Sequence, residues 1–259
     1  MSKLDEQVAV VTGGARGIGE VTARLLAGMG AAIVLNDLDE AALHLAGESL
    51  RTSGARVKTV VADVTTQAGA ERLIAAALDA FGRLDALVNN AGGGGSVDRP
   101  PALTIPDTSW QDMLAMYERN LGPTFQCTRA ALPAMRERRY GRIVNIASLA
   151  GRSRSITSGP AYAAAKAAII GFTRHVSAEL GADGITINAV APGLTFTDRV
   201  QASFSKKSAA RQYEVLSGIP LGRAGTPEEQ AAAIVFLCTP AASYITGAVL
   251  DVNGGLWVG

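Results

Sequence analysis

The sequence contains few of the residues that build metal centres and disulfide frameworks. Its 259 residues include two cysteines, Cys127 and Cys238, and two histidines, His44 and His175, all far apart in the chain. No CxxC or HExxH motif occurs, so neither a redox motif nor a zinc-binding pattern is present. Because a metal site needs several ligands brought together, we expect no metal and interpret both cysteines as buried thiols.

An excess of charge of one sign and a long hydrophobic run are also missing. Lys and Arg number 24 and Asp and Glu 23, which gives a formal net charge of +1. With no positive excess to attract phosphates, we expect no nucleic acid partner. The longest apolar runs fall well short of the roughly 18 residues that suggest a membrane span, and the segment Met1 to Gln7 has no signal-peptide hydrophobic region. We therefore expect a cytoplasmic protein that does not bind membranes.

Short runs rich in β-branched residues alternate with longer segments of helical periodicity. The predicted strands are Val8–Val11, Ala32–Leu35, Val57–Val61, Ala86–Val88, Arg142–Ile146, Thr186–Val190 and Ala248–Val252. The predicted helical segments are Gly17–Met29, Glu40–Leu50, Ala68–Phe81, Trp110–Arg138, Ala161–Leu180 and Pro227–Leu237. We expect Trp110–Arg138 to hold two helices, broken near Gly122 and Pro123, because proline interrupts helical hydrogen bonding.

The predicted strands are almost entirely apolar, which is typical of a sheet covered on both faces, and their alternation with helices requires right-handed crossovers between parallel strands. We therefore predict a single domain over residues 1–259, an α/β, Rossmann-like doubly wound sheet of seven parallel strands with helices on both faces. Ligands bind such sheets beyond the carboxyl ends of the strands. The polar segment Thr195–Gly218 follows a strand at that end and has the size of a mobile lid, so we expect a substrate loop at about 194–218.

A glycine-rich turn stands between the first predicted strand and the first predicted helix. It consists of Thr12-Gly13-Gly14-Ala15-Arg16-Gly17-Ile18-Gly19. Glycines let the backbone approach a pyrophosphate closely, and a helix N-terminus offers unpaired N–H groups with partial positive charge. Asp37 ends the second predicted strand, where a carboxylate can accept both hydrogen bonds of an adenosine ribose. The pattern predicts a bound dinucleotide.

Asp37 also bears on which dinucleotide is bound. A 2′-phosphate would meet Asp37 as a like charge, although Arg16 in the same turn could partly compensate. We therefore predict NAD in preference to NADP. Asp39 can cap the following helix alone, which leaves Asp37 free for the ribose.

Tyr162 and Lys166 form a Tyr-x-x-x-Lys pair, whose spacing places both side chains on one face of a helix. Ser148 follows the fifth predicted strand, so the three groups can converge at the ligand end of the sheet. Free tyrosine titrates near about 10, and a neighbouring cation is needed to favour its phenolate at neutral pH. Lys166 and the oxidised nicotinamide are both positive, so we expect them together to lower the pKa of Tyr162. Three more serines stand in the same loop and are alternatives to Ser148, which we favour because it directly follows the strand: Ser153, Ser155 and Ser158.

Together these motifs resemble the short-chain dehydrogenase/reductase family over essentially the whole chain. The matching segments are the glycine turn, Asp63-Val64, Asn89-Asn90-Ala91-Gly92, Asn120, Ser148, Tyr162 with Lys166, Asn188, Pro192-Gly193 with Thr197, and Asp251-x-x-Gly254-Gly255. The resemblance implies an NAD(P)-dependent oxidoreductase that interconverts a small-molecule secondary alcohol and a ketone.

The resemblance also implies a set of site residues. The implied catalytic residues are Asn120, Ser148, Tyr162 and Lys166. The implied cofactor-binding residues are Gly13, Arg16, Gly17, Ile18, Gly19, Asp37, Asp63, Val64, Asn90, Ala91, Gly92, Tyr162, Lys166, Pro192, Gly193, Thr195 and Thr197. In this assignment Tyr162 is the general acid/base and Ser148 orients the substrate oxygen. Lys166 also binds the nicotinamide ribose, and Asn120 holds a water that links Lys166 to solvent.

Two features depart from the family's pattern. Fourteen positions separate Ser148 from Tyr162, about one more than the family spacing, and Thr195 replaces an aliphatic residue. The segments around Gly93–Pro106 and Thr195–Gly218 would shape the substrate pocket, and neither shows a clear charged anchor in the sequence.

Three other functions are alternatives. The segment Arg139–Ile146 is similar to that of 3-oxoacyl-carrier-protein reductases, which makes this activity the second candidate. A non-catalytic NAD-binding sensor would be expected to lack Tyr162 or Lys166, and the glycine spacing disfavours a nucleotide-sugar epimerase. The family also implies a homotetramer, in which the helices Gly122–Arg138 and Ala161–Leu180 pair between subunits.

Overall fold

The computed structural model describes residues 4–94, 104–154 and 158–259. Its strands are all parallel and form one seven-stranded sheet in the order β3-β2-β1-β4-β5-β6-β7. They are β1 (Val8–Thr12), β2 (Ala32–Asp37), β3 (Val57–Val61), β4 (Ala86–Asn89), β5 (Gly141–Ile146), β6 (Ile185–Pro192) and β7 (Val249–Val252). The predicted doubly wound parallel sheet is confirmed. The strand order reverses between β1 and β4, and ligands bind such sheets at this switch point.

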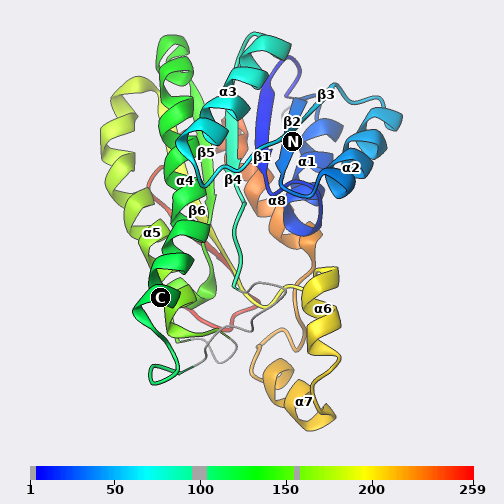
Figure 1. The fold of residues 1–259 in the computed structure, drawn as a ribbon, viewed down its shortest axis with the longest axis vertical. Helices are drawn as coiled ribbons and strands as arrows, with labels where there is room; N and C mark the ends of the chain where they lie inside the picture. The colour runs from blue at the N-terminus through cyan, green and yellow to red at the C-terminus, as the bar shows by residue number, and fades with distance from the viewer. Residues whose placement is uncertain (1–3, 95–103, 155–157) are drawn as a thin grey trace.

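Helices cover both faces of the sheet (Figure 1), with α3, α4 and α5 on one face and α1, α2 and α8 on the other. The helices are α1 (Gly17–Gly28), α2 (Glu40–Thr52), α3 (Gln67–Phe81), α4 (Trp110–Arg138), α5 (Pro160–Leu180), α6 (Asp198–Phe204), α7 (Ala209–Ser217) and α8 (Pro227–Cys238). The described residues also form three short 3-10 helices, η1 (Leu149–Gly151), η2 (Gly181–Asp183) and η3 (Pro240–Ala242).

Strand β1 shows why the buried strands are continuously apolar. Val8 and Val10 lie in the core beneath α3, α4 and α5, whereas Ala9 and Val11 lie in the core beneath α1, α2 and α8. Successive side chains of a strand point to opposite faces of the sheet. Both faces here are covered, so every position of the strand is buried, and every position except Thr12 is apolar.

Helix α4 runs without a break from Trp110 to Arg138, so the prediction of two helices separated near Gly122 and Pro123 is wrong. A proline inside a helix costs about 3 kcal/mol, because it lacks one N–H donor and its ring crowds the preceding turn. On α4, however, Pro123, Cys127 and Met135 are all buried, and each buried apolar side chain contributes about 1.5 to 3 kcal/mol. Packing against α3 and α5 therefore outweighs the local preference for a break.

The segment Thr195–Gly218, expected from the sequence to be an irregular loop, contains the helices α6 and α7. Thr197 caps α6 by accepting a hydrogen bond from the Val200 N–H, and Ser208 caps α7 in the same way through Arg211. Figure 1 shows both helices beyond the carboxyl edge of the sheet. We call residues 195–218 the lid segment.

Both cysteines are buried, as predicted, and burial raises the pKa of each thiol to about 12. Their thiolates are therefore scarce at neutral pH. In the part of the chain that the structure describes, no three His, Cys, Asp or Glu side chains gather in a way that could hold a metal ion. None of the helices in that same part combines the length and hydropathy that crossing a membrane requires.

Candidate active site

The glycine turn between β1 and α1 leaves no room for side chains. Gly13 and Gly17 both have φ of 60°, in the left-handed region that favours glycine. A Cβ atom on Gly19 would lie 2.3 Å from the carbonyl oxygen of Gly13. Helix α1 begins without a side-chain cap, so its first N–H groups stay open to an external acceptor. The turn therefore has the two properties, close backbone approach and free N–H donors, that bind a pyrophosphate.

Asn90 and Thr12 hold this turn against the end of β4. The Asn90 side-chain amide donates to the carbonyls of Thr12 and Gly13, at 3.0 Å and 2.9 Å. The Thr12 hydroxyl accepts from the backbone N–H groups of Asn90 and Ala91, both at 3.0 Å. Both donors of the Asn90 amide are directed to the turn, so its side chain supports the turn from behind.

Replacement of Gly19 by alanine should weaken cofactor binding by roughly 5- to 100-fold, because overpacking a tight contact costs about 1 to 3 kcal/mol. The added methyl group must displace the Gly13 carbonyl, which lies in the turn itself. Titration of NADH fluorescence measures the dissociation constant. Gly28→Ala is the matched control on the same helix, because a Cβ there meets no atom within 4 Å. Equal affinity of the Gly19→Ala and wild-type proteins would rule out the turn as the pyrophosphate site.

Asp37 ends β2 beside the glycine turn. Its carboxylate accepts hydrogen bonds from the backbone N–H of Ala15 at 3.2 Å and of Leu38 at 2.8 Å. Arg16 forms an exposed ion pair with Asp39, which also caps α2 through the Ala42 N–H, as predicted. An exposed pair of this kind contributes little, about 0 to 1 kcal/mol. Arg16 therefore pairs with Asp39 and not with Asp37, although this pair is weak.

Asp63 and Val64 follow β3 at the same edge of the sheet. The Asp63 carboxylate accepts from the Thr65 N–H at 3.0 Å and from the Thr65 hydroxyl at 2.7 Å, and Val64 is buried. Asn36, on β2, donates to the carbonyl of Ala62 at 2.9 Å and so ties the two strand ends together. The segment predicted to contact an adenine is therefore held close to Asp37.

Ser148, Tyr162 and Lys166 come together at the end of β5. The hydroxyls of Ser148 and Tyr162 are hydrogen bonded to each other. The Lys166 Nζ lies 5.7 Å from the centre of the Tyr162 ring and donates to the carbonyl of Ile146 at 2.7 Å. The convergence of the three residues, inferred from the sequence, is what the structure shows.

Burial shifts the two titrating groups in opposite directions. It raises the pKa of Tyr162, while the hydrogen bond from Ser148 and the positive charge of Arg199 act to lower it. Burial lowers the pKa of Lys166 to about 8. In the protein alone the pKa of Tyr162 is therefore raised, whereas the sequence predicted a lowered value with an oxidised nicotinamide beside it. The expected lowering depends on that additional positive charge.

Asn120 fixes the glycine segment that follows β4. Its side-chain oxygen accepts from the Gly93 N–H at 3.0 Å, and its amide donates to the carbonyls of Gly93 at 3.2 Å and Met116 at 3.1 Å. A Cβ on Gly94 would lie 3.5 Å from the Tyr162 ring. Asn120 thereby positions the backbone that faces Tyr162. No hydrogen bond links it to Lys166 within the described residues, and the water-holding role stays a prediction.

The residues after β6 lead from the sheet to the lid segment. Gly193, next to Pro192, donates its N–H to the carbonyl of Val252 at 2.9 Å, and the Thr195 hydroxyl donates back to the Gly193 carbonyl at 3.2 Å. A Cβ on Gly17 would lie 3.2 Å from the Thr197 methyl group. The start of the lid segment therefore lies directly over the glycine turn.

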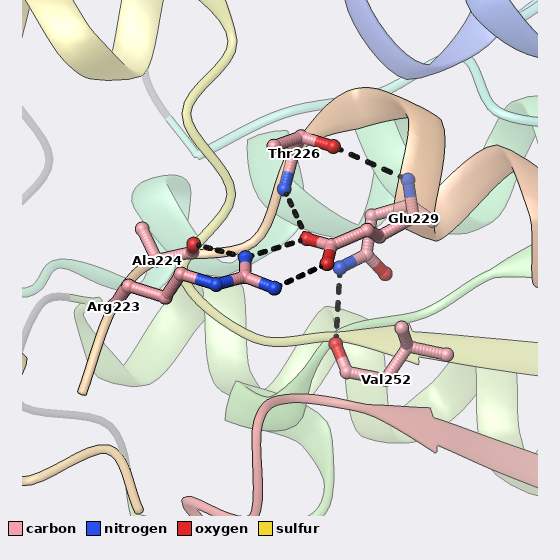
Figure 2. A network of polar contacts seen from close by, with 6 residues as sticks. Arg223, Ala224, Thr226, Glu229 and Val252 are labelled. Atoms are coloured by element: carbon pink, nitrogen blue, oxygen red, sulfur yellow. Dashed lines mark hydrogen bonds and ion pairs between the residues drawn. The ribbon is translucent and has the colours of Figure 1, made fainter. Parts of the chain in front are cut away.

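The lid segment is closed at its base. Phe196 donates to the Gly225 carbonyl and Gly225 donates to the Leu194 carbonyl, both at 2.9 Å. Figure 2 shows the adjoining network, in which Arg223 binds the Glu229 carboxylate and Glu229 accepts from the Thr226 N–H. The next residue, Gln230, donates its side-chain amide to the Val252 carbonyl at 3.1 Å. The chain on either side of the lid segment, at Leu194 and Gly225, is thus held together next to α8 and β7.

Arg199 is a candidate site residue that the sequence did not reveal. It lies on α6, and a Cβ on Gly93 would lie 3.4 Å from both terminal nitrogens of its guanidinium. Its charge also acts on Tyr162. In the sequence, only the position of Arg199 two residues after Thr197 pointed to the site. The direction of its side chain becomes clear only in the folded lid segment. The alternative hydroxyl Ser155, and residues 95–103 of the expected pocket segment Gly93–Pro106, lie outside the described residues.

Comparisons with known proteins agree with this geometry. Residues 13–257 match the family model described as "Enoyl-(Acyl carrier protein) reductase". The chain is 41% identical over 260 residues to 3-oxoacyl-(acyl-carrier-protein) reductase of Synechocystis sp., covering 99% of both chains. It is 39% identical over 254 residues to the short-chain reductase protein NovJ of Streptomyces niveus, covering 96% of this chain and 94% of that one. Among solved structures, levodione reductase superposes with a TM-score of 0.90 at 33% identity over 98% of both chains.

Proposed function

The chain belongs to the short-chain dehydrogenase/reductase family and is an NAD(P)-dependent oxidoreductase acting on CH–OH groups, and from this premise we propose that Tyr162 is its general acid/base. The observation that carries the proposal is the hydrogen bond between the Tyr162 and Ser148 hydroxyls, with the Lys166 ammonium 5.7 Å from the Tyr162 ring centre. In the direction of alcohol oxidation, the Tyr162 oxygen receives the proton of the substrate hydroxyl. In the direction of ketone reduction it returns that proton to the carbonyl oxygen.

Each neighbour of Tyr162 has a distinct part in this proton transfer. Ser148 hydrogen bonds the substrate oxygen and holds it within reach of Tyr162, which lowers the barrier through orientation and charge stabilisation. The positive charge of Lys166 favours the phenolate form of Tyr162. The nicotinamide, when bound, accepts or supplies the hydride at the substrate carbon.

The residues present fit a dinucleotide. The uncapped N-terminus of α1 and the crowded Gly13 and Gly19 support a pyrophosphate at the glycine turn. Asp37 would bind the adenosine ribose. Asp63 and Val64 would line the adenine pocket, and Pro192 through Thr197 would hold the carboxamide. We infer a preference for NAD, because a 2′-phosphate would meet the Asp37 carboxylate while Arg16 is engaged with Asp39.

A panel of secondary alcohols, sugars and 3-oxo esters, each assayed with NAD(H) and NADP(H), tests the proposal. We expect turnover of at least one alcohol–ketone pair, with higher catalytic efficiency for NAD. Equal or higher efficiency with NADP would overturn the inferred preference. Binding of NAD without turnover of any panel member would instead favour a non-catalytic sensor.

Reduction of a 3-oxoacyl group on a carrier protein is the second candidate function. It is favoured by the 41% identity to the Synechocystis reductase, which spans nearly the whole of both chains. A 3-oxoacyl thioester of the carrier protein in the panel distinguishes the two. Catalytic efficiency far above that for free ketones would select this candidate.

We also infer a cytoplasmic homotetramer. Helices α4 and α5 pack along one another, and α4 leaves the Phe125 ring partly exposed beside them. In such an assembly the exposed Phe125 ring would be buried against a second subunit. Sedimentation of the purified protein tests the assembly, and a monomer at assay concentration would contradict it.

A further inference from the structure

Arg199 reaches from the lid segment to the position where the substrate must lie. Both terminal nitrogens of its guanidinium face Gly93, and the next residue, Gly94, lies against the Tyr162 ring. The charge of Arg199 acts on the Tyr162 hydroxyl, the group that exchanges a proton with the substrate. An atom bound to the reacting carbon of the substrate would therefore be within reach of both residues.

The positive charge of Arg199 has no carboxylate partner in the described part of the chain. Other arginines, including Arg16, Arg211 and Arg223, form ion pairs there, and Arg199 forms none. Its side chain is also exposed. The second cation of the site, Lys166, is buried and donates to the Ile146 carbonyl. Arg199 is therefore the cation available to a ligand that enters from solvent.

We propose that Arg199 binds a carboxylate of the substrate, so that the enzyme acts on oxo acids and the corresponding hydroxy acids. The proposal rests on the oxidoreductase function proposed above and names its substrate class. The planar guanidinium matches a carboxylate with two parallel hydrogen bonds, which fixes orientation as well as adding affinity. Such an anchor would hold the carbonyl carbon against Tyr162 and Ser148 in one defined pose.

The pyrophosphate of the cofactor is the other anion that could meet Arg199. The glycine turn, however, is covered by the methyl group of Thr197, whereas Arg199 faces Gly93 on the Tyr162 side of the site. The substrate is therefore the favoured source of the anion. Measurement of cofactor affinity in the same variants separates the two sources.

The test compares an oxo acid with its neutral ester in wild type and in Arg199→Met. Two matched pairs are used, acetoacetate with methyl acetoacetate and levulinate with methyl levulinate. We expect wild type to prefer the acids. The Arg199→Met variant should lose roughly 10- to 100-fold in catalytic efficiency for the acids, the usual effect of removing a hydrogen-bonded charge, and less than about 3-fold for the esters. Arg199→Lys keeps the positive charge but cannot form two parallel hydrogen bonds. Its catalytic efficiency for the acids should lie between those of wild type and Arg199→Met.

Arg211→Met is the matched control. It removes an exposed arginine from the same lid segment, where Arg211 pairs with Glu214, and should leave both efficiencies unchanged. The corresponding hydroxy acids, which NADH cannot reduce, are also titrated into the NADH complex while cofactor fluorescence is followed, so the anion preference is measured whether or not turnover occurs. Absence of turnover with acid-selective binding would count against the proposed function but support the Arg199 site.

Three outcomes would overturn the proposal. One is an equal loss of catalytic efficiency for acids and esters in Arg199→Met, which would show that Arg199 acts through Tyr162 and not by binding the substrate. Another is a preference for the esters in wild type. The third is weaker NADH binding by Arg199→Met with the acid preference intact, which would make the pyrophosphate the ligand.

Discussion

Replacement of Tyr162 by phenylalanine should lower kcat by at least about 100-fold, the lower end of what general acid/base groups contribute. The variant keeps the ring that packs against Gly94 and deletes only the hydroxyl that hydrogen bonds to Ser148. The dissociation constant for NADH should change little, because the pyrophosphate and ribose contacts are made elsewhere. Steady-state kinetics and NADH fluorescence titration measure the two quantities.

The tyrosine replacement has a matched control in Tyr244→Phe. Tyr244 is fully exposed, so loss of its hydroxyl should leave kcat unchanged. Activity of Tyr162→Phe within a few fold of wild type would eliminate Tyr162 as the proton carrier. A large rise in the NADH dissociation constant would mean that the substitution damages the site rather than the chemistry.

Replacement of Lys166 by methionine should lower kcat by roughly 100-fold at pH 7. A cation at the distance of a neighbouring side chain stabilises a phenolate by a few kcal/mol at the effective dielectric of a partly buried site, and about 2.7 kcal/mol corresponds to 100-fold. The Lys58→Met control removes an exposed lysine from β3 and should be neutral. Wild-type kcat in Lys166→Met would show that Tyr162 works without this charge.

The same lysine should make stability depend on pH. Burial lowers the pKa of Lys166 from 10.5 to about 8, so between these values the unfolded chain holds a proton that the folded chain has lost. The free energy of unfolding therefore rises with pH across this window through Lys166, and methionine has no such contribution. Denaturant unfolding of wild type and Lys166→Met is measured from pH 7 to 10. The free energy of unfolding of wild type should rise relative to that of the variant as the pH increases. A constant difference would contradict the lowered pKa.

The parts of the site that could be predicted from the sequence are those that short segments determine. The glycine turn is specified by a strand, a helix start without a capping side chain and the glycines between them, all within residues 8 to 20. The Tyr162–Lys166 pair is specified by helical spacing. The carboxyl ends of parallel strands share one edge, which explains why residues after β1, β2, β4 and β5 meet without further information.

The parts that could not be predicted depend on contacts between distant segments. The continuity of α4 at Pro123 is decided by burial against α3 and α5, which a local proline rule does not include. Helices α6 and α7 are only 7 and 9 residues long, so each offers too few apolar positions for a helical period to be recognised in the sequence. The approach of Arg199 to Gly93 joins residues far apart in the chain, and only the folded lid segment brings them together.

The anchored base of the lid segment bears on how this enzyme could change its substrate. The chain leaves β6 just before Leu194 and comes back beside it at Gly225, where backbone hydrogen bonds hold the two ends side by side. The Arg223–Glu229 pair fixes the returning end to α8. Insertions between such ends add little closure entropy and leave the anchoring hydrogen bonds in place. Residues 198–222 can therefore be exchanged as a cassette, which leaves Thr197, Arg223 and the hydride-transfer residues in place while new selectivity is introduced.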